Sequence, residues 1–288
     1  MVISSLDLAA KSELTFLAEL VADLRAAAPA WQPLLVGAMA RDLLLHHAHN
    51  IPVSRATEDI DLGFAVADWE GFAALRAALL ASTHFAAHSA MIHKFFYRRR
   101  CQVDLVPFGG LELADGSIAW PPRGDEVMTV AGFREALASA TDVMLPEGQR
   151  LLVVSLPMLA VLKVIAWSER HATAPRKDAA DLLLILKNYL DAGNQHRLYD
   201  EAAHLLDDSN FDYERAGAWL AGHDAAAAMR KDAAEQTRVH QMISTLLTKE
   251  VDPDGPLRLI GEVGGRDAEN MRLLLAAFLN GFNGEEVR

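Results

Sequence analysis

The spacing of apolar residues predicts alternating helices and strands in the first half of the chain. Leu14, Leu17 and Val21 recur at helical spacing, so we expect an amphipathic helix over residues 12–28. Short apolar runs predict strands at 34–36, 60–66, 91–98 and 102–108, with shorter pieces near 127 and 151–154. Helical patterns fall between these runs at 39–47 and 69–81.

The pattern becomes helical throughout after Leu156. Pro157 suits the first turn of a helix, where its missing N–H costs no hydrogen bond. Helical periodicity then predicts helices at 157–171, 177–190, 195–206, 213–222, 232–249 and 267–282. We therefore expect an α/β (α+β) fold in two domains. Residues 1–155 form a head with a small mixed sheet flanked by helices, and residues 156–288 form a helical C-terminal domain.

Two aspartates on a predicted strand carry the strongest chemical signal. Side chains alternate between the faces of a strand, so Asp59 and Asp61 share one face while Ile60 points to the other. Glu58 is out of phase with this pair and is not expected to join it. A third acid, Asp104, lies in an apolar segment, where a charge is unusual unless a site needs it. If its strand pairs beside the first, the three carboxylates converge.

Three converging carboxylates suit divalent cations. Mg2+ takes oxygen ligands, and two ions (Mg2+ or Mn2+) held by Asp59, Asp61 and Asp104 would serve in-line phosphoryl transfer. The alternative is that Asp59 caps a turn, Asp61 is a solvated strand residue and Asp104 lies on an exposed edge. That alternative is favoured for any one aspartate, but not for the three together with the glycine turn that precedes them.

A glycine turn connects the first predicted strand to the next helix. Gly37 lets the backbone approach a phosphate, and the N–H groups of Gly37 and Ala38 are expected to point to it from the helix N-terminus. Arg41, one turn further on, would add a charge-assisted contact. Alone the signal is weak, because many such turns contain glycine, and Arg41 paired with Asp42 or Glu58 is a common surface feature. The turn is neither a P-loop nor a GxGxxG fingerprint.

The glycine turn, the pair Asp59-x-Asp61 and Asp104 follow one another in the order of the polymerase-β-like nucleotidyltransferase superfamily. The segment Arg55-Ala-Thr57-Glu-Asp59-Ile-Asp61-Leu resembles the R-x-S/T-x-D-I-D-L pattern of the AbiEii branch, the toxins of type IV toxin–antitoxin systems. The resemblance implies an NTP substrate, bound metal ions and an antitoxin partner. It also places Thr57 among the nucleotide-binding residues.

Two motifs of the helical half resemble that branch's K-x-x-A-x-x-x-R and, more loosely, R-x-x-D-x-x-D-L patterns: residues 163–170 and 176–182. By this resemblance Lys163 contacts the nucleotide phosphates, and Asp178 lies close to the site as a polar or acid/base participant. Lys163 and Arg170 share a helix face, as do Asp178 and Asp181 on the next helix. The two faces are expected to form one polar seam across the cleft. The alternative is an ordinary set of interhelical salt bridges.

The resemblance spans about residues 34–190, and two departures concern the phosphate turn. Ala38 stands where a second Gly or Ser is usual, so a hydroxyl contact to phosphate is lost while the N–H remains. The spacing from Gly37 to Asp59 is also longer than in the minimal superfamily motif. The turn further resembles the G-G-x-V-R-D-x-L-L turn of tRNA CCA-adding enzymes, but that family's R-R-D-F-T-x-N segment has no counterpart. This second resemblance adds only tRNA ends to the candidate acceptors.

The function implied is transfer of a nucleoside monophosphate from an NTP to an acceptor hydroxyl, with release of pyrophosphate. The acceptor is expected to be tRNA, another RNA or a protein. Two alternatives stay open. One is a noncatalytic nucleotide- or partner-binding protein that keeps the head. The other is a small-molecule nucleotidyltransferase of the aminoglycoside-modifying kind.

Charge narrows the class of nucleic-acid contact. The net charge is -12, with 39 acidic against 27 basic residues. Because binders of long duplexes neutralise phosphates, they are usually basic, and this balance argues against that class. Arg98, Arg99 and Arg100 are a local exception. They are either an edge-strand solubility device or a guide for RNA or a triphosphate, and the sequence favours neither.

Cysteine and histidine add little. The single cysteine, Cys101, excludes an internal disulfide and a multi-cysteine zinc site, and we expect it to pack as a small apolar residue. His46, His47 and His49 end a predicted helix, where histidine is favourable without binding metal. The chain contains neither ~18 consecutive apolar residues nor a signal-peptide pattern at its start, so we expect a cytoplasmic protein with no membrane contact.

Overall fold

The computed structural model describes residues 5–53, 59–173, 176–207, 211–229, 233–256, 258–263 and 267–285. The chain divides into two compact units. The head unit comprises the described residues of 3–43 and 53–155, and the helical unit comprises those of 44–52 and 156–288. Residues 44–52 thus group with the helical unit, although the sequence pattern places them in the head. The division into two domains at residue 155 stays a prediction.

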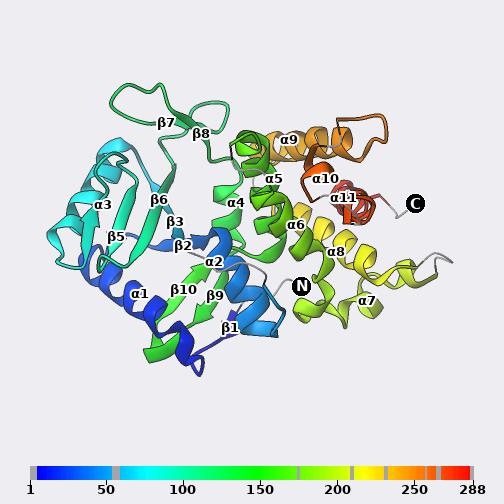
Figure 1. Cartoon of the computed structure of the whole chain (residues 1–288), viewed down its shortest axis with the longest axis horizontal. Helices are drawn as coiled ribbons and strands as arrows, with labels where there is room; N and C mark the ends of the chain where they lie inside the picture. The colour runs from blue at the N-terminus through cyan, green and yellow to red at the C-terminus, as the bar shows by residue number, and fades with distance from the viewer. Residues whose placement is uncertain are drawn as a thin grey trace. The chain divides into compact units, whose positions relative to one another are not determined.

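Ten strands are present in the described part of the head unit: β1 (Ser5–Asp7), β2 (Pro33–Val36), β3 (Asp59–Val66), β4 (Phe85–Ala87), β5 (Lys94–Tyr97), β6 (Cys101–Gly109), β7 (Ser117–Ala119), β8 (Val127–Thr129), β9 (Thr141–Met144) and β10 (Arg150–Val153). Eight of them form one sheet in the order β1-β9-β10-β2-β3-β6-β5-β4, while β7 and β8 pair separately (Figure 1). The large sheet is mixed: β3 and β6 are parallel, and β2 and β3 are antiparallel. The expected α/β fold with a mixed sheet is confirmed.

The centre of the sheet follows from the alternation of apolar and polar residues. On β3, Ile60, Leu62 and Phe64 are buried, whereas Asp59 and Asp61 are half-buried on the other face. β6 repeats this pattern, with a half-buried Asp104 between buried neighbours. The apolar face anchors each strand in the core. The acidic side chains are therefore held on a rigid element rather than on a loop.

Four α-helices are described in the head unit: α1 (Thr15–Ala27), α2 (Gly37–Asp42), α3 (Trp69–Ala81) and α4 (Phe133–Ala138). α1 buries Leu17, Val21 and Leu24, the stripe expected of an amphipathic helix. α2 begins directly after β2 and continues as a π-helical stretch, Leu43–His47, so that the predicted helix at 39–47 is real but irregular. α3 begins at an Asp68 cap, whose carboxylate accepts from the Gly71 N–H at 2.8 Å.

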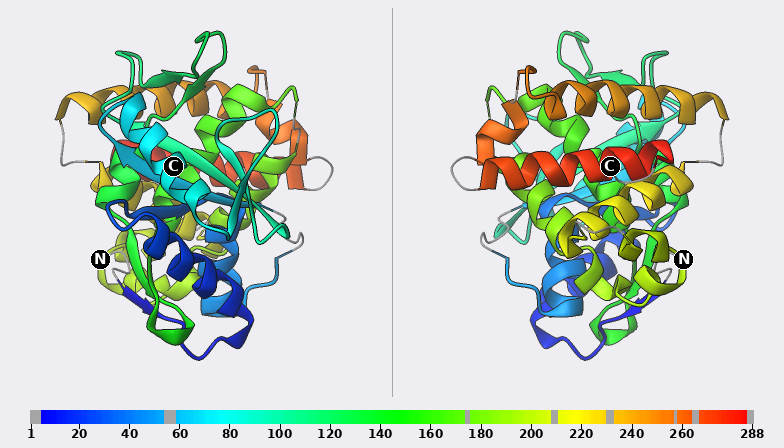
Figure 2. Two further views of the ribbon diagram at one scale, coloured as in Figure 1. Left: turned by 90° about the vertical axis from the view of Figure 1, so that its left-hand side faces the viewer. Right: turned by 90° about the vertical axis from the view of Figure 1, so that its right-hand side faces the viewer.

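The described helical unit contains α5 (Leu156–Arg170), α6 (Lys177–Lys187), α7 (Arg197–Asp200), α8 (Tyr213–Ala228), α9 (Ala233–Val251), α10 (Arg258–Val263) and α11 (Asp267–Asn283). α8 and α11 run side by side, as the right-hand view of Figure 2 shows. Two glycines make their close approach possible. A Cβ on Gly222 would lie 2.0 Å from the Phe278 carbonyl oxygen, and one on Gly281 would lie 2.0 Å from that of Trp219.

A buried polar network ties α7 to α8. Arg197, only 1% exposed, donates two hydrogen bonds to Asp224, at 2.6 and 2.7 Å. Tyr189 donates to the same carboxylate at 2.5 Å, and Asn194 accepts from Arg197 at 3.0 Å. Because a buried charge is costly unless paired, this set fixes the short α7 segment in place.

Several elements differ from the sequence prediction. The predicted helix at 195–206 is wrong: the segment holds only the four residues of α7 and a 3-10 turn over 203–207. Gly193, with φ at 87°, interrupts the helical backbone before this segment. The buried Arg197 then pairs with Asp224 of α8. The strand predicted at 91–98 shortens to β5. The sequence does not predict β1, β4, β7, β9, α4 and α10, because segments of three to six residues show too little periodicity.

Candidate metal centre

β3 and β6 bring three carboxylates together. The two strands are parallel neighbours, and their register places Asp61 directly beside Asp104. One oxygen from each of Asp59, Asp61 and Asp104 lies within 4.8 Å of the others. The expected pairing of the two strands is thus present, and the parity argument for Asp59 and Asp61 agrees with their shared face. Oxygen donors at this separation fit a hard divalent cation such as Mg2+.

The glycine turn lies against this cluster. β2 pairs antiparallel with β3, and Val36 is the register partner of Asp61. Gly37 follows with φ at 71°, in the left-handed region that disfavours side chains. A Cβ at this position would lie 2.0 Å from Asp61 Oδ2. The first helical turn of α2 therefore starts in contact with the acidic cluster, and only glycine permits the approach.

Lys94 and Gln102 hold the third carboxylate. The Lys94 ammonium contacts Asp104 Oδ2, and the Gln102 amide donates to Asp104 Oδ1 at 2.9 Å. Sequence reasoning missed both residues. Gln102 was visible as the i−2 neighbour of Asp104 on the same face, but Lys94 depends on the register of β5 with β6, where it pairs with Asp104. Each oxygen of Asp104 thus has a donor, which fixes the plane of the carboxylate.

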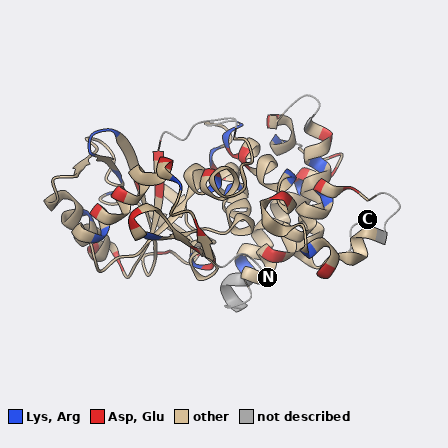
Figure 3. Cartoon of the chain, turned by 90° about the horizontal axis from the view of Figure 1, so that it is seen from below, with Lys and Arg blue, Asp and Glu red and all other residues tan. Residues whose placement is uncertain are grey.

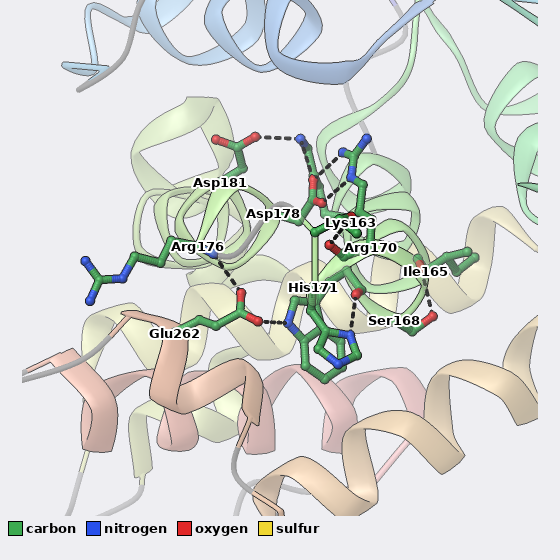
Figure 4. Close-up of polar contacts among 11 residues, drawn as sticks. Lys163, Ile165, Ser168, Arg170, His171, Arg176, Asp178, Asp181 and Glu262 are labelled. Carbon is green, nitrogen blue, oxygen red and sulfur yellow. Dashed lines mark hydrogen bonds and ion pairs between the residues drawn. The ribbon is translucent and has the colours of Figure 1, made fainter.

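The helical unit holds a second charged group. Lys163 on α5 is 4% exposed and donates to Asp181 at 2.5 Å and to Asp178 at 3.2 Å, both on α6 (Figure 4). Arg170, two turns after Lys163, donates to both Asp178 oxygens, at 2.6 and 2.7 Å. The expected facing of the two helices is present. These contacts are the interhelical salt bridges that the sequence analysis gives as the alternative to a nucleotide-binding role.

Asp178 is ionised in this setting. Burial raises the pKa of its carboxyl, but the hydrogen bond and charge of Arg170 and the charge of Lys163 outweigh burial, so the pKa lies below its ordinary value. Glu262 of α10 approaches from another side. It accepts from the Trp167 indole at 3.0 Å and from the Arg176 N–H at 2.9 Å (Figure 4). The start of α6 is therefore fixed by partners on two other helices.

One protein-family model matches the part of the chain that contains both the acidic cluster and the Lys163 group. A family model described as "Nucleotidyl transferase AbiEii toxin, Type IV TA system" matches residues 20–256, most of the chain. The chain belongs to the AbiEii nucleotidyltransferase toxin family. The match includes the glycine turn, the three aspartates and the Lys163 group. No curated protein and no solved structure matches the chain.

In this AbiEii chain three further residues, Arg41, Ala38 and Thr57, are predicted to bind the nucleotide. Arg41 is 2% exposed, and its Nε donates to Asp42 at 2.8 Å. Ala38 is buried in the first turn of α2. Thr57 lies outside the described residues. Contact of Arg41, Ala38 or Thr57 with a nucleotide stays a prediction.

Cys101 is not an activated nucleophile. Burial and the negative charges of Asp59 and Asp104 raise the pKa of its thiol, which keeps it protonated at neutral pH. The raised pKa argues against thiolate chemistry at Cys101. None of the described helices combines the length and apolarity that a membrane span requires.

Proposed function

We propose that this AbiEii-family protein transfers a nucleoside monophosphate from an NTP to an acceptor hydroxyl and releases pyrophosphate. The observation that carries the proposal is the convergence of Asp59, Asp61 and Asp104 beside the Gly37 turn. Divalent ions held by these carboxylates, two Mg2+ or Mn2+ ions in our proposal, would supply positive charge around the reacting phosphorus and the leaving group.

We propose that the triphosphate and the acceptor bind on opposite sides of the acidic cluster, the first toward β2 and the second toward β5. The N–H groups of Gly37 and Ala38 would hold the triphosphate on the β2 side, because the turn adjoins Asp61 there. Asp104 lies on the other side of Asp61, next to β5. We assign it to the acceptor: the acceptor hydroxyl would give its proton to the Asp104 carboxylate, its oxygen would bond to the α-phosphorus, and the bond from that phosphorus to the bridging oxygen of the leaving pyrophosphate would break.

Residues assigned by family resemblance complete the proposal. Lys163 would bind the nucleotide phosphates, with Asp178 as a polar or acid/base participant, and Arg41 and Thr57 would add nucleotide contacts. Lys163 has three donor hydrogens and two aspartate partners, which leaves one donor for a phosphate. The family description also supports an antitoxin protein as partner, and we propose a cytoplasmic location for both.

Asp61→Asn tests the function directly. We expect it to reduce nucleotide incorporation at least 100-fold with little change in fold, since it removes a metal-binding charge and keeps the side-chain shape. Each labelled NTP is incubated with total cellular RNA, protein and metabolites, and the labelled fraction is identified. Asp125→Asn, on an acid exposed in the same unit, is the matched control and should retain full activity.

The outcomes separate the candidate functions. Equal incorporation by wild type and Asp61→Asn would refute the proposal. Binding of NTP with Mg2+ in calorimetry, without pyrophosphate release on any acceptor pool, would favour the noncatalytic alternative. Label in small metabolites alone would favour the aminoglycoside-type alternative.

A further inference from the structure

The face of the sheet that carries the carboxylates continues past Asp104 onto β5. The strand register places two adjacent rows of side chains across these strands: Asp61, Asp104 and Lys94 in one row, and Asp59, Gln102 and Phe96 in the next. Residues directly opposite on neighbouring strands share a face, and diagonal neighbours lie about 7–8 Å apart. Phe96 is therefore one diagonal step from Asp104.

Phe96 is an exposed aromatic residue on a strand with a buried opposite face. It is 37% exposed, whereas Phe95 and Tyr97 on either side are 1% and 0% exposed. Its ring stacks against that of His88, with centroids 5.9 Å apart and planes 28° apart. His88 Nδ1 accepts from the Met91 N–H at 3.2 Å, which holds the imidazole in place. An exposed aromatic ring that is held in orientation by a half-buried imidazole suits stacking of a nucleic-acid base.

The turn between β5 and β6 presents basic side chains next to this aromatic pair. Arg98 and Arg99 have φ of 47° and 55°, and the Arg100 N–H donates to the Tyr97 carbonyl at 3.0 Å. A tight turn with two left-handed residues favours Asn-Gly, so arginine is a poor choice for the turn itself. Arg98 pairs with Asp23 at 2.9 Å. Arg99 and Arg100 are exposed and leave their charges available to solvent.

The position of this surface matches the acceptor side of the site. The sheet order β2-β3-β6-β5 places the Gly37 turn and Phe96 on opposite sides of the carboxylates. Arg100 is the last residue of the turn, directly before β6, and precedes Asp104 by four residues, which spans about 13 Å at the rise of a strand. If a triphosphate binds at the Gly37 turn, the β5 side of the carboxylates is open to the acceptor.

We propose that Phe96, His88, Arg99 and Arg100 form the acceptor surface and that the acceptor is the end of a single-stranded nucleic acid. A base stacks on Phe96, backbone phosphates lie at Arg99 and Arg100, and the terminal hydroxyl reaches Asp104. This rests on the proposed function. Lys and Arg residues are interspersed with Asp and Glu in both units (Figure 3). A long duplex needs many basic contacts to its phosphates, whereas this small surface offers two arginines, which fits the end of a single strand better.

Binding of short fluorescent oligonucleotides tests the surface without chemistry. Anisotropy is measured on the full chain in EDTA and without NTP, using single-stranded RNA and DNA of one sequence to identify the sugar preferred. Phe96→Ala should weaken binding about tenfold, the loss of one stacked base. Arg99→Gly with Arg100→Gln should reduce the salt slope by about 1.4, the loss of two phosphate contacts. Val127→Ala, at an exposed apolar position on β8 of the separate two-stranded sheet, and Lys11→Gln, at a basic position before α1, should leave binding unchanged.

Arg99→Gly also separates binding from folding. Glycine suits the left-handed position, so its melting temperature should equal or exceed that of the wild type while binding falls. Unchanged affinity in the Phe96 and arginine variants, or no binding of either strand by the wild type, would overturn the acceptor surface. Loss of binding in these variants beside an inactive wild type would instead refute the transfer reaction and retain the surface.

Discussion

At the scale of single residues, the acidic cluster depends on Gly37. We predict that Gly37→Ala destabilises the protein by about 2–4 kcal/mol, because it combines a left-handed backbone with a clash against Asp61. Gly148 has φ at 70° with nothing near its missing Cβ, so Gly148→Ala should show the backbone cost alone, about 1 kcal/mol. Urea unfolding measures both. Equal losses in the two variants would show that Asp61 does not confine the turn.

A second residue-scale prediction concerns pH. Because the pKa of Asp178 is lowered in the folded protein, its stabilisation is complete above the unfolded value of about 3.9 and is lost as pH falls through the folded pKa. Asp178→Asn should cost on the order of 2 kcal/mol at pH 7, and the difference from wild type should shrink below about pH 4. Unfolding by urea between pH 7 and pH 3 measures this.

Asp142→Asn is the control for that series. Asp142 pairs with Arg150 on the surface, where its side chain is 34% exposed, so its loss should cost less than about 1 kcal/mol. A gap between wild type and Asp178→Asn that stays constant down to pH 3 would contradict the lowered pKa of Asp178 in the folded protein.

At the scale of elements, α8 and α11 approach so closely that Gly222 has no room for a side chain. Gly222→Ala should destabilise the protein by about 1–3 kcal/mol, because a methyl group cannot fit against the Phe278 carbonyl, although alanine is the better helix former. Gly261 on α10 has nothing within 4 Å, so Gly261→Ala should instead stabilise by up to about 1 kcal/mol. Thermal unfolding of both variants checks the opposite signs; stabilisation by Gly222→Ala would refute the close packing.

At the scale of the whole molecule, the proposed ligands should couple to stability. Three carboxylates within one small cluster repel one another, and the proposed divalent cation with NTP would bind only the folded arrangement. Mg2+ and NTP at about 100-fold above their dissociation constants should stabilise the protein by about 2.7 kcal/mol. Differential scanning fluorimetry should show the shift in wild type and its loss in Asp61→Asn. A full shift in the variant would place the ligands elsewhere.

The sequence alone determined the features that depend on local periodicity. Alternation along 59–62 put Asp59 and Asp61 on one face and excluded Glu58 from it, and helical spacing put Lys163 and Arg170 together. The family motifs are short and local, so they too could be read directly, and the match over residues 20–256 agrees with them.

Only the tertiary structure decided what depends on pairing between distant segments. The β3–β6 register brought Asp104 to Asp61, and the β5–β6 register brought Lys94 to Asp104 and Phe96 to the same face. Arg41 is buried and donates to Asp42, and the burial of a side chain cannot be deduced from its spacing along the helix. Register is the reason: a shift of one residue moves every side chain to the other face, and nothing within a single strand specifies its partner's alignment.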